Sequence, residues 1–109
     1  MRVFLRSKIH RARVTDSNPN YEGSITIDRE LMQAADILEG ERVLVADITN
    51  GERLETYVIQ GAKGVVCMNG AAAKKIKKGD IITIMSFQIT DRPEKAKKIL
   101  LGADNTIQN

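Results

Sequence analysis

The spacing of apolar and polar residues predicts a mainly β protein with two short helices. Residues 2–13 are expected to form a long strand, because Val3, Leu5 and Ile9 alternate with basic side chains. The segment "SNPN" at 17–20 breaks this pattern. Further strands are predicted over "SITID", "GVVCM", "DIITIMSFQIT" and "KKILLGADN", the last one before a loose end.

The first helix is predicted over "RELMQAADI". Asp28 directly precedes this run, and its carboxylate is expected to cap the helix N-terminus. Leu31, Met32 and Ala35 offer an apolar face, and Gly40 is expected to end the unit. A second short helical run is "AAAKKI", shortly after the strand "GVVCM".

The clearest local signal is "RVLVADIT-NG-ERLETYVI", two β-rich runs around Asn50-Gly51. Asn-Gly is the pair best suited to a two-residue hairpin turn. The register that this turn predicts is Ile48 opposite Arg53, Val45 opposite Thr56 and Leu44 opposite Tyr57. Arg53 and Tyr57 then share one sheet face, about 13 Å apart, and Thr56 points to the other face.

The composition fits a single domain spanning residues 1–109. Aromatic residues make up 4% of the chain and tryptophan is absent, so the core must consist of Ile, Val, Leu, Ala and Met. Cys67 is the only cysteine, which excludes an internal disulfide and fits a reducing compartment. The N-terminal residues have no continuous apolar run, so neither a signal peptide nor a membrane span is expected. These features predict a soluble cytoplasmic domain.

The formal net charge of +3 permits anionic partners. Basic residues cluster at 2–13, 74–78 and 94–98. The last two clusters read either as solvated surface segments or as part of a nucleic-acid patch, although no aromatic residues interleave with them as stacking platforms. His10 is the only histidine, so no zinc cluster is expected. No phosphate-binding loop and no nucleophile elbow are present in the sequence.

The stretch "YEGSITID" offers a different chemistry at Gly23-Ser24. A serine hydroxyl can attack the carbonyl of the preceding residue and convert the amide into an ester. Elimination then cuts the chain and leaves dehydroalanine, which hydrolyses to a pyruvoyl group. A preceding glycine helps, because it permits strained backbone geometry and leaves its carbonyl unshielded. Without further context, Gly-Ser reads as an ordinary turn.

Five segments in order supply that context: "SKIHRARVT", "YEGSITID", "ITNGERLETYVI", "NGAAA" and "GDIITIMSF". Across residues 7–87 the chain resembles the aspartate 1-decarboxylases, small pyruvoyl-dependent enzymes that make β-alanine for pantothenate. Leu54 and Ala46 depart from the family pattern, where aromatic residues are common; both positions lie outside the reactive groups. The resemblance implies a double-psi β-barrel and a homotetramer with sites between neighbouring subunits.

The resemblance also implies roles for individual residues. Self-cleavage between Gly23 and Ser24 would give chains 1–23 and 24–109, with Ser24 becoming the pyruvoyl group that forms a Schiff base with aspartate. Thr56 would stabilise the oxyanion during cleavage, and Tyr57 would donate the proton. The substrate-binding residues implied are Lys8, Arg53, Asn69, Gly70, Ala71 and Ala72, with His10 and Tyr21 in supporting roles. No PLP and no metal are expected, and a maturation factor is an open possibility.

Each of these residues also has an ordinary interpretation. Lys8 and His10 share a strand face with Arg6, and a solvated face accounts for all three. Arg53 and Tyr57 fit a cross-strand surface pair. Thr56 fits a β-branched filler and Asn69 a turn residue, and Cys67 fits a small buried hydrophobe. The rival function is a non-catalytic β-barrel that binds nucleic acid through its basic strand and lysine clusters.

Overall fold

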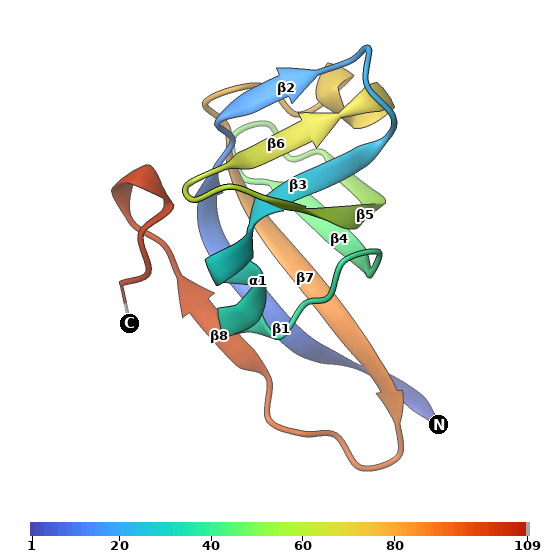
Figure 1. Cartoon of the computed structure of the whole chain (residues 1–109). Helices are drawn as coiled ribbons and strands as arrows, with labels where there is room; N and C mark the ends of the chain where they lie inside the picture. Colours follow the sequence, from blue (N-terminus) through green and yellow to red (C-terminus); the bar gives the residue numbers. More distant parts are fainter. Residues whose placement is uncertain (109) are drawn as a thin grey trace.

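The computed structural model describes residues 1–108, so residue 109 of the predicted domain lies outside the described part. It consists mainly of strands (Figure 1). In chain order the elements are β1 (Arg2–Arg13), β2 (Asp16–Asn18), β3 (Ser24–Asp28), α1 (Arg29–Ala35), β4 (Arg42–Asp47), β5 (Arg53–Gly61), β6 (Val66–Asn69), the 3-10 helix η1 (Gly70–Lys74), β7 (Ile81–Thr90), β8 (Lys97–Leu100) and the 3-10 helix η2 (Ala103–Asn105).

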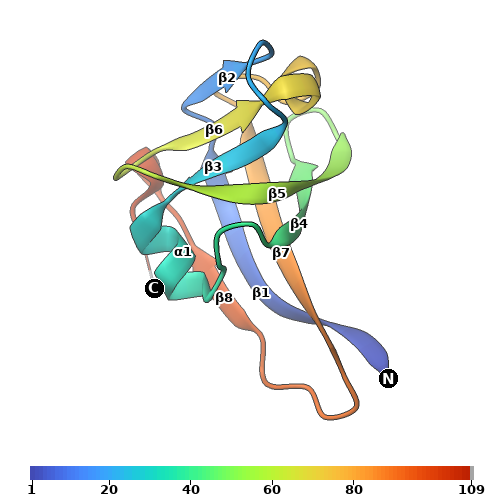
Figure 2. The ribbon, with the colours of Figure 1, turned by 45° about the vertical axis from the view of Figure 1, so that its right-hand side comes forward.

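The strands form one mixed sheet in the order β2-β6-β3-β5-β4-β7-β1-β8. β3 runs parallel to β5, β1 to β8 and β2 to β6, and the other pairs are antiparallel. Two views show the sheet curling round, with β1 and β7 behind and β6, β3 and β5 crossing in front (Figures 1 and 2). The prediction of a mainly β, barrel-like fold with short helices is therefore confirmed.

The core consists of aliphatic side chains and methionine, as the composition predicts. Ile9, Ile25, Ile27, Val58 and Ile84 are completely buried. All four aromatic residues of the chain are at least partly exposed. Burial of aliphatic surface from alternating strand positions therefore supplies the hydrophobic stabilisation.

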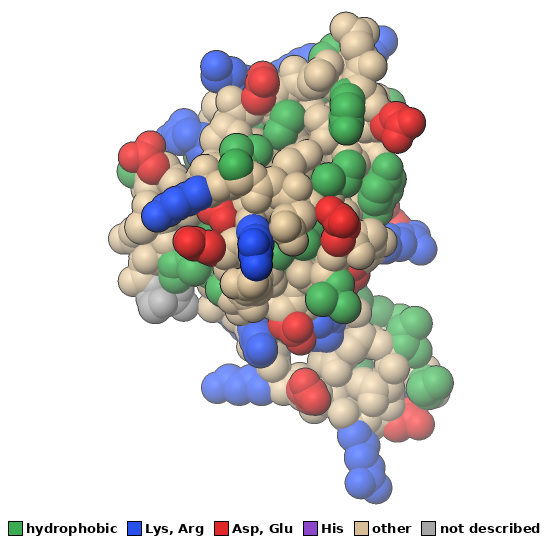
Figure 3. All heavy atoms as spheres, in the orientation of Figure 1, with side chains coloured by type: hydrophobic (Ala, Val, Ile, Leu, Met, Phe, Trp, Pro, Cys, Tyr) green, Lys and Arg blue, Asp and Glu red, His purple; other side chains and the backbone are tan. Residues whose placement is uncertain are grey.

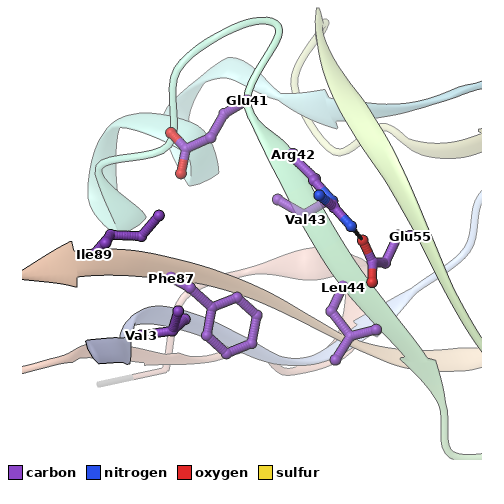
Figure 4. A pocket seen from close by; sticks show the side chains of 8 residues that line it. All are labelled: Val3, Glu41, Arg42, Val43, Leu44, Glu55, Phe87 and Ile89. Atoms are coloured by element: carbon purple, nitrogen blue, oxygen red, sulfur yellow. Dashed lines mark hydrogen bonds and ion pairs between the residues drawn. The ribbon is translucent and has the colours of Figure 1, made fainter. Parts of the chain in front are cut away.

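β1 and β7 pair along most of their length, and their outer ends project beyond the barrel (Figure 1). Val3 and Ile89 pair there and are 66% and 69% exposed. Side chains of the first strand were predicted to alternate between core and solvent. The inward positions of this strand are fully buried only from Ser7 onwards. Beside the projecting ends lies a hollow of about 540 Å³, with the Arg42–Glu55 ion pair along one side (Figure 4).

The first helix begins as predicted. The Asp28 carboxylate accepts a hydrogen bond from the Glu30 backbone N–H at 2.7 Å, and its other oxygen accepts one from Gly64 at 2.7 Å. The predicted apolar face of α1 is buried. The helix ends at Ala35 with Asp36 in the left-handed conformation, so the prediction that Gly40 ends the unit is wrong by several residues. Gly40 instead has positive φ in the turn before β4.

The register predicted for the β4–β5 hairpin is wrong by two residues. Thr56 pairs with Val43, and Tyr57 pairs with Arg42, so the loop has four residues, 48–51, instead of two. The loop is held by the Asp47 carboxylate, which accepts hydrogen bonds from the N–H groups of residues 49 and 50 at 2.7 and 3.3 Å. Because side chains alternate with period two, a shift of two residues leaves every side chain on its predicted face.

The sequence predicted a break in the chain at residues 17–20 and a loose C-terminal end. The structure differs from the prediction at both places. Residues 16–18 form β2, a three-residue strand beside β6. Beyond β8 the chain folds back, with Leu101 bridged to Ile107 and Asn105 buried. The Asn105 side chain joins separate elements, because it accepts from the Arg13 N–H at 2.7 Å and donates to the Gly64 carbonyl at 3.1 Å.

Candidate active site

Ser24 is completely buried at the first position of β3. It pairs with Asn69 of β6, whose side-chain amide donates to Ser24 Oγ at 2.8 Å and to Thr26 Oγ1 at 3.0 Å. The serine hydroxyl donates to the Glu22 carbonyl oxygen at 3.4 Å. The hydroxyl therefore points back over the segment that precedes Ser24, toward Glu22.

Gly70 allows β6 and η1 to approach that bond closely. Its φ is +70°, and a Cβ there would lie 2.6 Å from Gly23 Cα and 3.0 Å from the Tyr21 carbonyl oxygen. Any side chain at position 70 would therefore displace the segment before Ser24. Gly23 itself has no positive φ, and a Cβ on it would meet nothing within 4 Å. The left-handed strain that a glycine permits is thus found at Gly70 and not at Gly23.

The parallel register of β3 and β5 brings the segment before Ser24 toward the hairpin. Ile25 pairs with Val58, so the same register extended backwards sets Ser24 beside Tyr57 and Gly23 beside Thr56. A hollow of about 450 Å³ opens at this place. It is lined by Gly23, Leu54, Glu55, Thr56, Tyr57, Asn69, Ala71, Ala72 and Lys75. Six of the predicted site residues thus share one hollow in a single chain.

Sequence reasoning missed Glu55 and Lys75 in this lining. Glu55 lies on the same face of β5 as Arg53 and Tyr57. The alternation of side chains along this strand could therefore have identified Glu55 as a site residue. Lys75 could not be found that way, because other segments set its position: Asn50 Nδ2 donates to its carbonyl at 2.8 Å, and Glu52 pairs with its ammonium at 3.0 Å.

Other predicted site residues lie outside this hollow. Arg53 is exposed at the start of β5, and Tyr21 is 55% exposed. Gly70 is buried and lies against Gly23. Lys8 and His10 line a separate hollow between β1 and β8. The structure therefore does not bring Arg53, Lys8 and His10 to the Gly23–Ser24 bond within one chain.

His10 is held by a contact between its Nδ1 and Thr83 Oγ1 at 3.2 Å. Burial lowers the pKa of the imidazole, and the positive charges of Lys8 and Arg11 lower it further. The ring is therefore neutral at pH 7, where it offers a hydrogen-bonding group without adding charge. Cys67 is only partly buried, and its thiol donates to Asn69 Oδ1 at 3.4 Å. Burial raises the pKa of this thiol, which keeps it in the unreactive protonated form.

Comparison with known proteins identifies the family. The model of the aspartate decarboxylase family matches residues 1–108. A protein named aspartate 1-decarboxylase from Syntrophus aciditrophicus is 56% identical, and the alignment covers 99% of this chain and 98% of that protein. One of the same name from Syntrophomonas wolfei is 47% identical, over 99% of this chain and 97% of the relative. The chain belongs to the aspartate decarboxylase family.

The rival interpretation as a nucleic-acid-binding barrel is not favoured. Within the lysine cluster 74–78, Lys75 is paired with Glu52 and Ile76 is completely buried. On the face seen in Figure 3, acidic and basic side chains are interspersed, without a continuous basic surface. Among residues 1–108, no three His, Cys, Asp or Glu side chains gather as metal ligands, and no helix is long and apolar enough to cross a membrane.

Proposed function

We propose that this chain decarboxylates L-aspartate at its α-carboxylate, giving β-alanine and carbon dioxide, with a pyruvoyl group formed by its own cleavage at Gly23–Ser24. The observation that carries the proposal is the buried Ser24 hydroxyl, which accepts a hydrogen bond from Asn69 at 2.8 Å and donates one to the Glu22 carbonyl, one residue before the Gly23 carbonyl that it would attack. Membership of the aspartate decarboxylase family supports it. The product suits a role in supplying pantothenate synthesis.

The bonds made and broken in the cleavage belong to residues of this chain. Ser24 Oγ attacks the Gly23 carbonyl carbon, the C–N bond breaks and an ester forms. Removal of the Ser24 Cα proton breaks the Cβ–O bond, which frees the Gly23 carboxylate and leaves dehydroalanine; water then replaces its nitrogen, which leaves as ammonia. Thr56 stabilises the oxyanion on the Gly23 carbonyl, supported by its place beside Gly23 in the extended β3–β5 register.

In the decarboxylation, Tyr57 is the proton donor. A pyruvoyl group at position 24, where Asn69 holds the serine, would supply an electron-withdrawing carbonyl to which the substrate amine can bind. Once carbon dioxide has left, the substrate Cα must receive a proton in its place. Tyr57 lines the same hollow as Gly23 and is 40% exposed, so its hydroxyl can reach a substrate held there. Asn69 orients the substrate, and Ala71 and Ala72 shape the wall.

Arg53 and Lys8 hold the carboxylate that survives the reaction. The leaving carboxylate must not be tightly paired, because catalysis gains only from contacts that strengthen in the transition state. A guanidinium suits the retained group, since it binds a carboxylate through two parallel hydrogen bonds.

Both cations lie outside the hollow of their own chain. We therefore propose a homotetramer in which neighbouring subunits complete each site, with His10 and Tyr21 as supporting residues. We expect the protein in the cytoplasm, because reducing conditions there keep the single thiol of Cys67 unpaired. A maturation factor would act on the Gly23–Ser24 bond.

Mass spectrometry of the intact protein tests this proposal. The wild-type chain is expected to yield fragments 1–23 and 24–109, the larger beginning with a pyruvoyl group, and to form β-alanine from L-aspartate. Ser24→Ala is the matched control and should remain one inactive chain. A wild-type chain that stays whole after prolonged warm incubation, alone and with cell extract, would refute the proposal.

A further inference from the structure

The antiparallel register of β3 and β6 gathers four polar side chains on one face of the two strands. Ser24 pairs with Asn69, and Thr26 pairs with Cys67. Because side chains alternate along a strand, these four project from the same face. The residues between them belong to the hydrophobic core on the opposite face. Thr26 and Cys67 are thus the neighbours of the Ser24–Asn69 pair within one small polar group.

The side-chain amide of Asn69 is held at both of its ends. Its Nδ2 donates to Thr26 Oγ1 at 3.0 Å and to Ser24 Oγ at 2.8 Å, and its Oδ1 accepts from the Cys67 thiol at 3.4 Å. The thiol is also 3.8 Å from the Met68 carbonyl, a longer contact. Burial raises the pKa of Cys67, so the thiol keeps the proton that it donates. Asn69 is 4% exposed, so these neighbours, and not bulk water, decide which way its amide points.

The direction of this amide decides which group meets Ser24 Oγ. In the observed direction an N–H group points at Oγ, whereas a half-turn of the amide would place Oδ1 there. Oγ becomes negative in the elimination: Ser24 Cα loses a proton, a Cα–Cβ double bond forms, and the pair of the broken Cβ–Oγ bond stays on Oγ as part of the Gly23 carboxylate. An N–H donor stabilises that developing charge, and an amide oxygen would oppose it.

We propose that Thr26 and Cys67 are positioning residues for chain cleavage: they hold the Asn69 amide so that its N–H groups face the reacting serine. This inference rests on the proposed function, which places the cleavage at Gly23–Ser24. Both residues act through Asn69 on the oxygen that leaves Cβ. Their loss should therefore slow the elimination more than the attack that forms the ester, so that ester accumulates.

Thr26→Val tests this, because it removes the acceptor and keeps the β-branched shape. The freshly purified chain should cleave about tenfold more slowly, the factor expected for loss of one hydrogen bond. Its uncleaved fraction should contain ester, which neutral hydroxylamine cuts to leave serine, and not pyruvoyl, at the head of 24–109. Thr26→Ser keeps the hydroxyl and should restore most of the rate. Thr90→Val, which removes a hydroxyl from another half-buried strand position, should behave as wild type.

Cys67 gives a second, independent pair of variants. Cys67→Ala removes the donor to Asn69 Oδ1 and should slow cleavage about two- to fivefold, since a thiol makes a weak hydrogen bond. Cys67→Ser keeps a donor and should cleave at close to the wild-type rate. Slower cleavage of Thr26→Val without ester, and without rescue in Thr26→Ser, would overturn the inference, because a general loss of structure slows both steps.

Hydrogen exchange of the Asn69 side-chain amide, followed by NMR in the Ser24→Ala chain, separates this inference from the proposed function. With the serine hydroxyl removed, Thr26→Val should speed this exchange about tenfold and Thr26→Ser should not. Faster exchange in a protein whose Ser24 chain never cleaves would keep the amide positioning and overturn the proposed cleavage. A Ser24 chain that cleaves, with Thr26→Val changing neither cleavage nor exchange more than Thr90→Val does, would overturn the inference alone.

Discussion

The buried carboxyl of Asp47 should make stability depend on pH. Asp47 is 2% exposed, and one of its oxygens accepts N–H groups of the hairpin loop at 2.7 and 3.3 Å. Its other oxygen has no hydrogen-bond partner among the described residues. Burial is the main cause that raises the pKa of Asp47 to about 6, followed by the neighbouring carboxyl group of Asp80. An isosteric substitution, Asp47→Asn, removes the titration and keeps the acceptor that holds the loop.

The direction of the effect follows from the two pKa values. The folded pKa is about 6, and the unfolded pKa is about 3.9. Below pH 4 both states hold the proton, whereas between pH 4 and 6 only the folded state does. Stability therefore falls as pH rises through this window, by about 3 kcal/mol for a difference of about two pH units. The pKa of Asp80 is lowered, first of all by the neighbouring Asp47 carboxyl group, so Asp80 titrates below this window.

Denaturant unfolding at pH 4, 5, 6 and 7 measures this, with Ser24→Ala as the common background so that no chain cleaves. Asp47→Asn should be as stable as its parent at pH 4 and up to about 3 kcal/mol more stable at pH 7. Asp104→Asn, at an exposed left-handed position that asparagine tolerates, is the control for loss of one charge. A difference between Asp47→Asn and its parent that is equal at pH 4 and pH 7 would refute the assignment of the titration to Asp47.

Four further substitutions test the site. Thr56→Ala should slow chain cleavage about 10²- to 10³-fold, the cost of losing one oxyanion donor; a normal cleavage rate on gels would exclude that role. Tyr57→Phe should cleave normally and still become covalently attached to aspartate on borohydride reduction, but lose about 10²-fold or more in β-alanine formation; turnover at the wild-type rate would leave Tyr57 a packing role. Arg53→Lys should cleave normally and lose about tenfold in kcat/KM for aspartate, and unchanged kinetics would contradict this. Gly70→Ala should lower the free energy of unfolding by about 1–3 kcal/mol and slow the cleavage, because its Cβ would meet Gly23. Wild-type stability of this variant would show that the segment before Ser24 can move aside without cost.

Local patterns predicted the elements whose residues carry a strong signal. The long first strand, the strand after Gly23 and the cap at Asp28 are all found where expected. β2 was missed, because a strand of three polar residues has no alternation and forms only through pairing with β6. The hairpin register was wrong because Asp47 bonds the loop backbone, and that side-chain contact outweighs the preference of Asn-Gly for a two-residue turn.

The sequence by itself determined which reactive side chains are present and on which face of its strand each of them lies. A glycine before Ser24 and the period of two that separates Thr56 from Tyr57 are local properties, set by covalent geometry and strand pleating. Tertiary structure decided which groups meet. Parallel pairing of β3 with β5 brings Gly23 to Thr56, and pairing of β1 with β8 brings Lys8 to Lys98, ninety positions away. Such contacts depend on register between distant strands, which is set by burial of the whole core and not by any segment alone.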